Sequence, residues 1–238
     1  MRAVESVKKQ TFTDYNLILV DDCSTDKTRQ IIREQVREAD VIMLSEKRFN
    51  GGSRNVGVAE APEAQYLLFL DADDEFIDAD IFQRIHDFVV DTDYPEMVRL
   101  PYLKHFDETG KERAYSVNEP DGTIAEVCHS KRVAPWTKAL KMGVFVPFPE
   151  NTLFEDVCQH IKQCDVVNSV AFFPDPVVKW HIHSASTSHN NSPKWQSSAY
   201  RFVADLMDLE LVNDYAKARR DKKLAGGKKG LLDGIAIQ

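Results

Sequence analysis

Short apolar runs alternate with stretches of helical spacing along the first hundred residues of the chain. Residues 16–20 (NLILV), 41–44 and 66–70 (YLLFL) are almost wholly apolar, which is typical of strands buried on both faces of a parallel sheet. Residues 27–38 and 81–90 carry apolar side chains at roughly helical spacing. The alternation predicts a doubly wound α/β fold, with a mostly parallel sheet flanked by helices and with ligands bound at the carboxyl ends of the strands.

The pattern changes toward the carboxyl terminus. A predicted helix over residues 154–163 follows an irregular middle region, and residues 217–229 hold seven Lys and Arg against one Asp. The change predicts an α/β domain over residues 1–190 and a helical extension with a basic tail over residues 191–238, its first helix at 195–215. We expect the tail to be either a solvated helix or a mobile extension that contacts an anionic acceptor or a membrane surface.

Composition narrows the class of protein. The 238 residues carry 30 Lys and Arg against 38 Asp and Glu, a formal net charge of −8, which argues against nucleic-acid binding by the whole domain. No apolar run approaches the roughly 18–20 residues of a membrane-spanning helix, and the first ten residues lack a signal-peptide core. The four cysteines follow no disulfide or zinc-ribbon spacing. These features predict a cytoplasmic enzyme whose contact with a membrane, if any, is peripheral.

Acidic residues follow two of the predicted strands. Asp71 and Asp73 come directly after YLLFL, and Asp21 and Asp22 come directly after NLILV. Carboxylates one residue apart project to the same side of an extended chain, which suits a hard divalent cation that also binds phosphate oxygens. Taken alone, a solvated acidic turn explains the first pair as well, and capping of the next helix explains the second equally well.

A glycine pair opens another predicted helix. Residues 50–55 (NGGSRN) read as a glycine turn that leads into a first helical turn. Backbone N–H groups at Gly52 and the guanidinium of Arg54 would together form a seat for a diphosphate. Without further motifs, a plain loop is the better explanation of two adjacent glycines.

Six segments occur in an order that resembles the family 2 glycosyltransferases, which are inverting enzymes with a GT-A fold that binds nucleotide sugars. They are SVKKQTFTDYNLILVDDCSTDKT, NGGSRNVGV, YLLFLDADDEF, PWTKAL, LFEDV and WHIHSASTS, and they span roughly residues 3–188. The combination is far more specific than any one motif. The resemblance implies a metal-dependent transferase of polysaccharide biosynthesis. It would move a sugar from a nucleotide diphosphate sugar, with a UDP-sugar as the expected donor, to a hydroxyl of a glycan, polymer or other acceptor.

The resemblance also implies roles for individual residues. Mn²⁺ or Mg²⁺ would be held by Asp73, with Asp71 assisting through water or the ribose and with His183 as a further ligand. Asp156 would be the general base, beside Glu155. The nucleotide sugar would be bound by residues from the first four segments: Asp21, Asp22, Gly52, Arg54, Asn55, Asp71, Trp136 and Lys138.

The amino terminus departs from the family pattern. Members begin with an apolar strand and a turn that read like VSVIIPVYN, whereas Met1 here starts within the helix that follows that strand. By the resemblance the strand would lie between NLILV and YLLFL, so its absence would leave backbone groups unpaired. Three explanations of the missing strand compete: the chain is truncated, a partner supplies the strand, or residues 234–238 (GIAIQ) form it.

Three other functions compete with the transferase. A phosphohydrolase of the haloacid-dehalogenase type also carries a DxD after an apolar strand, but it requires Thr or Val where Glu75 stands. A phosphoacceptor receiver domain leaves the remaining motifs unexplained. A non-catalytic descendant that binds sugars or a partner is the stronger alternative, and titration with UDP, with and without Mn²⁺, separates it from a transferase. The sequence names neither the donor sugar nor the acceptor.

Overall fold

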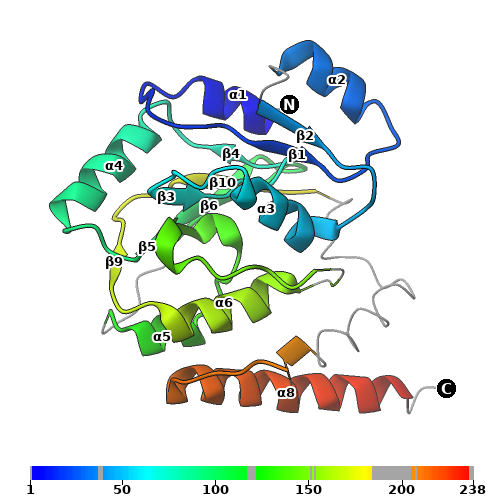
Figure 1. Cartoon of the computed structure of the whole chain (residues 1–238), viewed down its shortest axis with the longest axis vertical. Helices are drawn as coiled ribbons and strands as arrows, with labels where there is room; N and C mark the ends of the chain where they lie inside the picture. The colour runs from blue at the N-terminus through cyan, green and yellow to red at the C-terminus, as the bar shows by residue number, and fades with distance from the viewer. Residues whose placement is uncertain are drawn as a thin grey trace.

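Helices and strands alternate through most of the chain in the computed structural model, which describes residues 2–36, 40–116, 122–150, 152, 154–183, 205–206 and 208–235 (Figure 1). In chain order the elements are α1 (Arg2–Lys8), β1 (Leu19–Asp21), α2 (Thr28–Gln35), β2 (Val41–Met43), α3 (Phe49–Ala59), β3 (Tyr66–Leu68), β4 (Glu75–Phe76), α4 (Ile81–Asp91), β5 (Met97–Arg99), β6 (Tyr102–Phe106), β7 (Lys111–Tyr115), α5 (Ile124–His129), a 3₁₀ turn (Pro135–Thr137), β8 (Lys138–Lys141), a second 3₁₀ turn (Met142–Val144), α6 (Glu155–Val166), β9 (Val170–Phe172), β10 (Val178–Ile182) and α8 (Asp214–Ile235). The strands predicted at 41–44 and 66–70 and the helices predicted at 81–90 and 154–163 are confirmed.

The described strands form three sheets. β1 and β2 make a parallel pair, while β3-β8-β5-β9 and β4-β10-β6-β7 are four-stranded sheets in those orders. Three strand pairs are parallel (β1–β2, β5–β9 and β6–β10) and four are antiparallel. Figure 1 shows α1 and α2 on one side of the strands and α5, α6 and α8 on the other. The α/β class is confirmed. Both four-stranded sheets are mixed, since β8 lies antiparallel between β3 and β5, and β10 is antiparallel to β4 but parallel to β6.

Two apolar clusters hold the elements in place. α4 buries Ile81, Ile85 and Val89, which recur every four residues on one face, and packs them into a cluster with residues of β5 and β6. α6 buries Ile161 and Cys164 in a second cluster that includes residues of α5 and α8. Since an amphipathic helix is stabilised mainly by burying such a face, these clusters fix the end of β3 and the start of α6.

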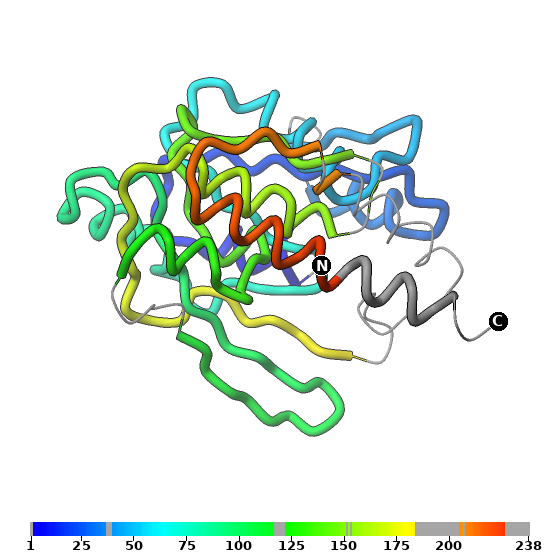
Figure 2. Tube along the Cα trace, turned by 90° about the horizontal axis from the view of Figure 1, so that it is seen from below, coloured from blue at the N-terminus to red at the C-terminus, as the bar shows by residue number. Residues whose placement is uncertain are grey.

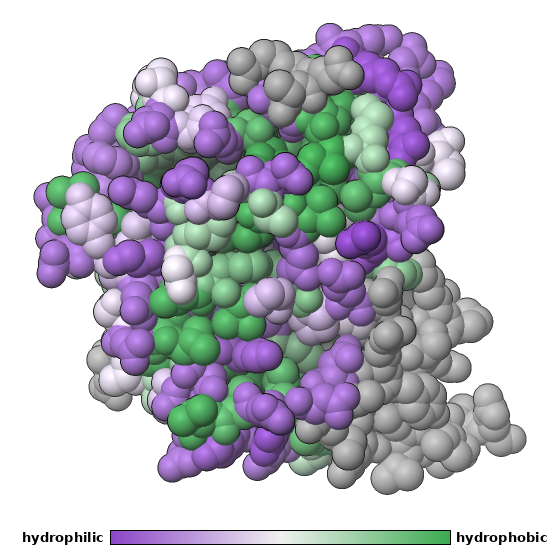
Figure 3. Space-filling view, in the orientation of Figure 1, coloured by the Kyte–Doolittle hydropathy of each residue, from purple (hydrophilic) through white to green (hydrophobic). Residues whose placement is uncertain are grey.

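The strands β1 and β3 are less enclosed than the sequence predicts. None of residues 16–20 is fully buried, and of β3 only Leu67 is. Among the described residues, β1 forms a ladder with β2 alone and β3 with β8 alone, so one edge of each strand has no strand partner. Figure 3 shows apolar side chains at the surface over β1 and β2. The expectation of strands buried on both faces is therefore wrong for this pair.

The basic tail is helical where the structure describes its side chains, with one face packed on the fold and with Lys222 exposed. It belongs to α8, which lies along α5 and α6 (Figures 1 and 2). Ala216 is fully buried, and Arg219, only 5% exposed, donates a hydrogen bond of 2.8 Å to the carbonyl oxygen of Ser130. Residues 234 and 235 end this helix, so these two are not part of the strand suggested for residues 234–238, and residues 236–238 lie outside the described residues. The helix predicted at 195–215 lies largely outside the described residues, and no described helix is long and apolar enough to cross a membrane.

Candidate active site

Arg54 joins two elements whose acids the sequence singled out. Its guanidinium lies 2.7 Å from Asp71 Oδ1, just after β3, and 2.7 Å from Glu155 Oε1, at the start of α6. It also covers the ring of Phe148, 5.3 Å from the ring centroid. The side chains of Arg54 and Glu155 are only 13% and 8% exposed. The structure thus brings three predicted site residues into one partly buried ion-pair cluster.

Burial and charge oppose each other in this cluster. Burial lowers the pKa of Arg54, but the carboxylates of Asp71 and Glu155 outweigh it and leave that pKa raised. Burial also raises the pKa of Glu155, and the Arg54 guanidinium offsets only part of that increase. A charged Glu155 therefore depends on Arg54, because a buried carboxylate without a cation is strongly disfavoured.

The two adjacent glycines lie within a helix and allow it to pack closely; they do not form a turn before the helix. α3 begins at Phe49, which has a φ of 59°. Both glycines therefore lie within the first turn of the helix. A Cβ on Gly51 would come within 2.3 Å of the carbonyl oxygen of Pro149, and one on Gly52 within 2.6 Å of Arg48 Cβ. The predicted glycine turn is therefore wrong: α3 approaches the 148–150 segment so closely at Gly51 that no side chain fits there.

Asn55 fastens α3 to the same segment. Its amide donates 2.9 Å to the carbonyl oxygen of Phe148 and accepts 2.9 Å from the N–H of Phe148. A third bond of 3.3 Å reaches Glu150 Oε1. Both hydrogen-bonding groups of one backbone residue are thus satisfied by one side chain, which places Phe148 under Arg54.

The carboxylates of the DxD segment face different partners. Asp71 faces Arg54, whereas Asp73, with 55% of its side chain exposed, lies 3.2 Å from His183 Nε2. The Arg2 guanidinium donates 3.0 Å to the carbonyl oxygen of Asp73. Asp73 and His183, two of the predicted metal ligands, are therefore side by side and accessible.

Asp74 is a buried acid that the sequence analysis did not single out. It is 1% exposed, and its Oδ1 accepts 2.9 Å from the backbone N–H of His181. Its Oδ2 has no hydrogen-bond partner among the described residues, and burial raises its pKa to about 8. Its N–H closes a turn onto the carbonyl oxygen of Asp71 at 3.1 Å. In the sequence, the inward direction of Asp74 is indicated by Phe76, an apolar residue two positions later.

The acid pair after β1 is held by backbone and arginine contacts. Asp21, 3% exposed, lies 2.6 Å from Arg29 Nε and accepts 3.2 Å from the N–H of Ser24. Burial raises its pKa, but the bonds from Ser24 and Arg29 outweigh it, so that the pKa is lowered overall. Asp22 accepts 2.6 Å from the N–H of Arg48, just before α3. The carboxylate of Asp21 is thus engaged by contacts within the fold, and Asp22 stabilises the start of α3.

Three other predicted residues make no hydrogen bond or ion pair with Arg54 or Asp71 among the described residues, although Asp156 directly follows Glu155 in the chain. Trp136 is 5% exposed and packs against the rings of Tyr102 and Trp180. Lys138 is 1% exposed, and its ammonium donates 2.8 Å to the carbonyl oxygen of Val133. Burial lowers the pKa of Lys138 to about 7. Asp156 accepts 2.9 Å from the N–H of Val157 at the start of its own helix.

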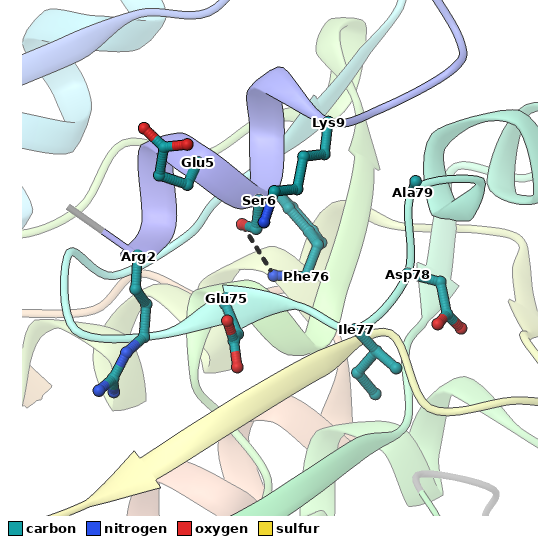
Figure 4. Close-up of a pocket in the computed structure, with 9 residues that line it drawn as sticks. All are labelled: Arg2, Glu5, Ser6, Lys9, Glu75, Phe76, Ile77, Asp78 and Ala79. Atoms are coloured by element: carbon teal, nitrogen blue, oxygen red, sulfur yellow. Dashed lines mark hydrogen bonds between the residues drawn. The ribbon is translucent and has the colours of Figure 1, made fainter. Parts of the chain in front are cut away.

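A pocket of about 270 Å³ lies beside the DxD segment, between α1 and β4 (Figure 4). Its walls come from one face of α1 and from the segment that runs through β4: Arg2, Glu5, Ser6, Lys9, Glu75, Phe76, Ile77, Asp78 and Ala79. Ser6 accepts 3.0 Å from the N–H of Phe76 and so holds the two walls together. The pocket adjoins Asp73 through Arg2 and does not include the Arg54 cluster.

Comparisons with known proteins point to one family. A family model described as Glycosyl transferase family 2 matches residues 1–121. The poly(ribitol-phosphate) beta-N-acetylglucosaminyltransferase TarS of Staphylococcus aureus is 39% identical over 234 residues, which cover 93% of this chain and 40% of that protein. Across three curated relatives, the chain spans between 10% and 64% of their length.

Solved structures match over almost the whole chain. S. aureus TarS 1–349 in complex with UDP-GlcNAc superposes with a TM-score of 0.71 and 20% identity, over 94% of this chain and 66% of that one. The mannosyltransferase PcManGT of Pyrobaculum calidifontis, in complex with GDP-Man and Mn²⁺, gives a TM-score of 0.62 and 15% identity, over 98% and 68%. At 20% identity or less, these superpositions establish the fold alone. That fold is GT-A, as predicted.

Proposed function

Because the chain belongs to glycosyl transferase family 2, we propose that it transfers a sugar from a UDP-sugar, with inversion, to a hydroxyl of an anionic polymer. The observation that carries the proposal is the pair of adjacent contacts at one edge of the fold. Arg54 ties the end of β3 to the start of α6, and Asp73 meets His183 beside it. A base, a cation site and a cationic side chain are the groups that such a transfer needs.

Asp73 and His183 are the residues we propose to hold the metal ion. Their donor atoms are 3.2 Å apart and partly exposed. A carboxylate with an imidazole suits Mn²⁺ better than Mg²⁺, which prefers oxygen ligands. When bound, the ion would neutralise the charge of the departing diphosphate. Arg54 holds Asp71 in place next to this site.

Asp156 is the residue we propose as general base. Glu155 accepts from Arg54 and is nearly enclosed, so its role in the proposal is to position Arg54. Asp156 is half-buried, and among the described residues no cation lies within ion-pair distance of it. Its carboxylate is therefore the freer of the two to accept a proton from an acceptor hydroxyl.

The donor and the acceptor are the finer parts of the proposal. The TarS structure that resembles this chain was solved with UDP-GlcNAc, and the name of TarS specifies poly(ribitol-phosphate) as its acceptor. We therefore propose UDP-GlcNAc as donor and a polyol-phosphate polymer as acceptor. Exposed or half-exposed cations of α8, such as Lys217, Arg220 and Lys222, would attract such a polymer.

A donor screen tests the proposal. Release of UDP or GDP is measured with a panel of UDP- and GDP-sugars, with a polyol-phosphate polymer as acceptor, in Mn²⁺ and in EDTA. We expect turnover with UDP-GlcNAc that requires both Mn²⁺ and the polymer. The cytoplasmic location and the domain boundary at residue 190 stay predictions.

A non-catalytic binding protein is the competing function. It is favoured by the partly exposed strands β1 and β3, because the family resemblance assigns the acids that follow these strands to nucleotide and metal binding. Absence of UDP binding, with and without Mn²⁺, together with no turnover on any donor, would support it over the transferase.

A further inference from the structure

A second group of metal-ligating side chains lies on the sheet β4-β10-β6-β7, apart from the contacts of Arg54 and of His183. His181 on β10 is the register partner of His105 on the parallel strand β6. Asp107 comes two residues after His105 and directly after the end of β6. One donor atom from each of the three lies within 4.8 Å of the others.

The distances within this group are close to those of a metal site. His181 Nδ1 lies 2.6 Å from Asp107 Oδ1, and His105 Nε2 lies 3.7 Å from the same oxygen. In a tetrahedral zinc site with bonds of about 2.0–2.1 Å, ligand atoms are roughly 3.3 Å apart. Small rotations of these three side chains would therefore admit an ion, with the buried His181 as its fixed point.

The outer nitrogen of each imidazole already has a carboxylate partner. His181 Nε2 lies 3.2 Å from Glu75 Oε1, and His105 Nδ1 lies 2.9 Å from Glu112 Oε1. Each ring is thus oriented by an acid on one nitrogen while the other nitrogen faces Asp107. That pairing of a metal-binding histidine with an outer carboxylate recurs in metal sites, where it fixes the ring and its tautomer.

We propose that His105, Asp107 and His181 bind a zinc-class divalent ion, with a fourth position open to water or a ligand. Two imidazoles and a carboxylate select transition metals over Mg²⁺ or Ca²⁺. The ion would be distinct from one at Asp73 and His183. It would also brace the DxD turn, because the N–H of His181 holds Asp74.

Charges around the group are consistent with an added cation. The acids Asp107, Glu75 and Glu112 are offset by Lys179, which lies 3.7 Å from Glu75 and 3.2 Å from Glu112, and by Arg2, 3.9 Å from Asp107. Three carboxylates thus face two permanent cations. Figure 4 shows Arg2 and Glu75 extending to the same side of β4.

The test is metal binding by the whole chain, stripped of metal and without nucleotide. Zn²⁺ is titrated by calorimetry, and Co²⁺ by the visible absorption of its coordinated form. We expect one Zn²⁺ per chain at this site. His105→Ala and Asp107→Asn should each weaken it at least tenfold, and Glu112→Gln, which removes only an outer partner, by about 10–100-fold.

Two control variants separate this site from others. His86→Ala removes an exposed histidine that also sits beside an acid, Asp87, and should leave Zn²⁺ binding unchanged. Asp73→Asn should leave it unchanged as well. Urea unfolding of His105→Gln, a milder change, checks that lost binding is not lost folding.

Two results would overturn the proposal. One is a parent chain that binds no Zn²⁺, and the other is equal binding by the parent and the His105 and Asp107 variants. If Asp73→Asn abolished Zn²⁺ binding, the ion would belong to the donor site, and the second site would be rejected. Binding of UDP with Mn²⁺ is measured separately, so failure here leaves the proposed transferase untouched.

Discussion

Replacing Arg54 by Met tests whether the ion-pair cluster holds the end of β3 to the start of α6. Methionine keeps the aliphatic contact with Phe148 but leaves Glu155, 8% exposed, without its cation. Removing one partner of a buried pair typically costs about 3–5 kcal/mol. We expect the free energy of unfolding to fall by that amount at pH 8. The measurement is urea unfolding with an unchanged slope against denaturant.

Arg84 supplies a matched control. It also covers a phenylalanine ring, Phe173, at 5.6 Å, and pairs with the acids Asp78, Asp80 and Asp175, but 32% of its side chain is exposed. Because exposed pairs contribute little, Arg84→Met should cost less than about 1 kcal/mol. Equal losses at the two arginines would refute the reasoning.

The loss at Arg54 should also depend on pH. The pKa of Glu155 in the folded chain is already raised by burial, and loss of the Arg54 charge raises it further. The folded variant then holds a proton that the unfolded chain releases, so its stability falls as pH rises through that window. The deficit should therefore shrink as the pH is lowered from 8 toward 5. A deficit that is constant with pH would contradict a buried, unpaired carboxylate as its cause.

Three further predictions concern packing, a buried amine and the base. Gly51→Ala should lower stability by about 1–3 kcal/mol in urea unfolding, because its Cβ would meet the carbonyl oxygen of Pro149. Gly226→Ala on α8, with nothing within 4 Å, should raise it by about 0.5–1 kcal/mol. Lys138, whose pKa burial lowers from 10.5 to about 7, binds fewer protons in the folded chain than in the unfolded one. Its penalty is therefore full below pH 7 and fades toward pH 10.5, by at most about 1.4 kcal/mol per pH unit. The gain in stability from Lys138→Met should thus be larger at pH 6 than at pH 9, and the reverse order would count against it. Asp156→Asn should lower turnover by about 10²–10⁴-fold with UDP binding intact, whereas parental turnover would exclude Asp156 as base.

Local pattern in the sequence predicted local structure well. The run YLLFL became β3, and the apolar spacing of residues 81–90 became α4. β8 was not foreseen, because a strand that enters between two others carries no distinctive period of its own. The glycine pair was misread for a related reason: its cause, the carbonyl oxygen of Pro149, lies almost a hundred residues away.

The sequence predicted which residues belong to the candidate site better than it predicted the contacts among them. Family resemblance singled out Arg54, Asp71 and Glu155, but only the fold shows that one arginine joins both acids. The group formed by His105, Asp107 and His181 was not predicted. His105 and His181 meet through strand register, which a single sequence does not encode in any short motif.

Binding of UDP in Mn²⁺ and in EDTA, by the parent chain and by Asp73→Asn, tests the central claim most directly. Calorimetry should show that Mn²⁺ strengthens UDP binding to the parent at least tenfold, and that Asp73→Asn loses this gain while its urea midpoint is unchanged. Asp78→Asn, an equally exposed acid outside the site, should behave as the parent does. Binding of UDP by Asp73→Asn that is as tight and as Mn²⁺-dependent as in the parent would contradict a metal-dependent donor site at this turn.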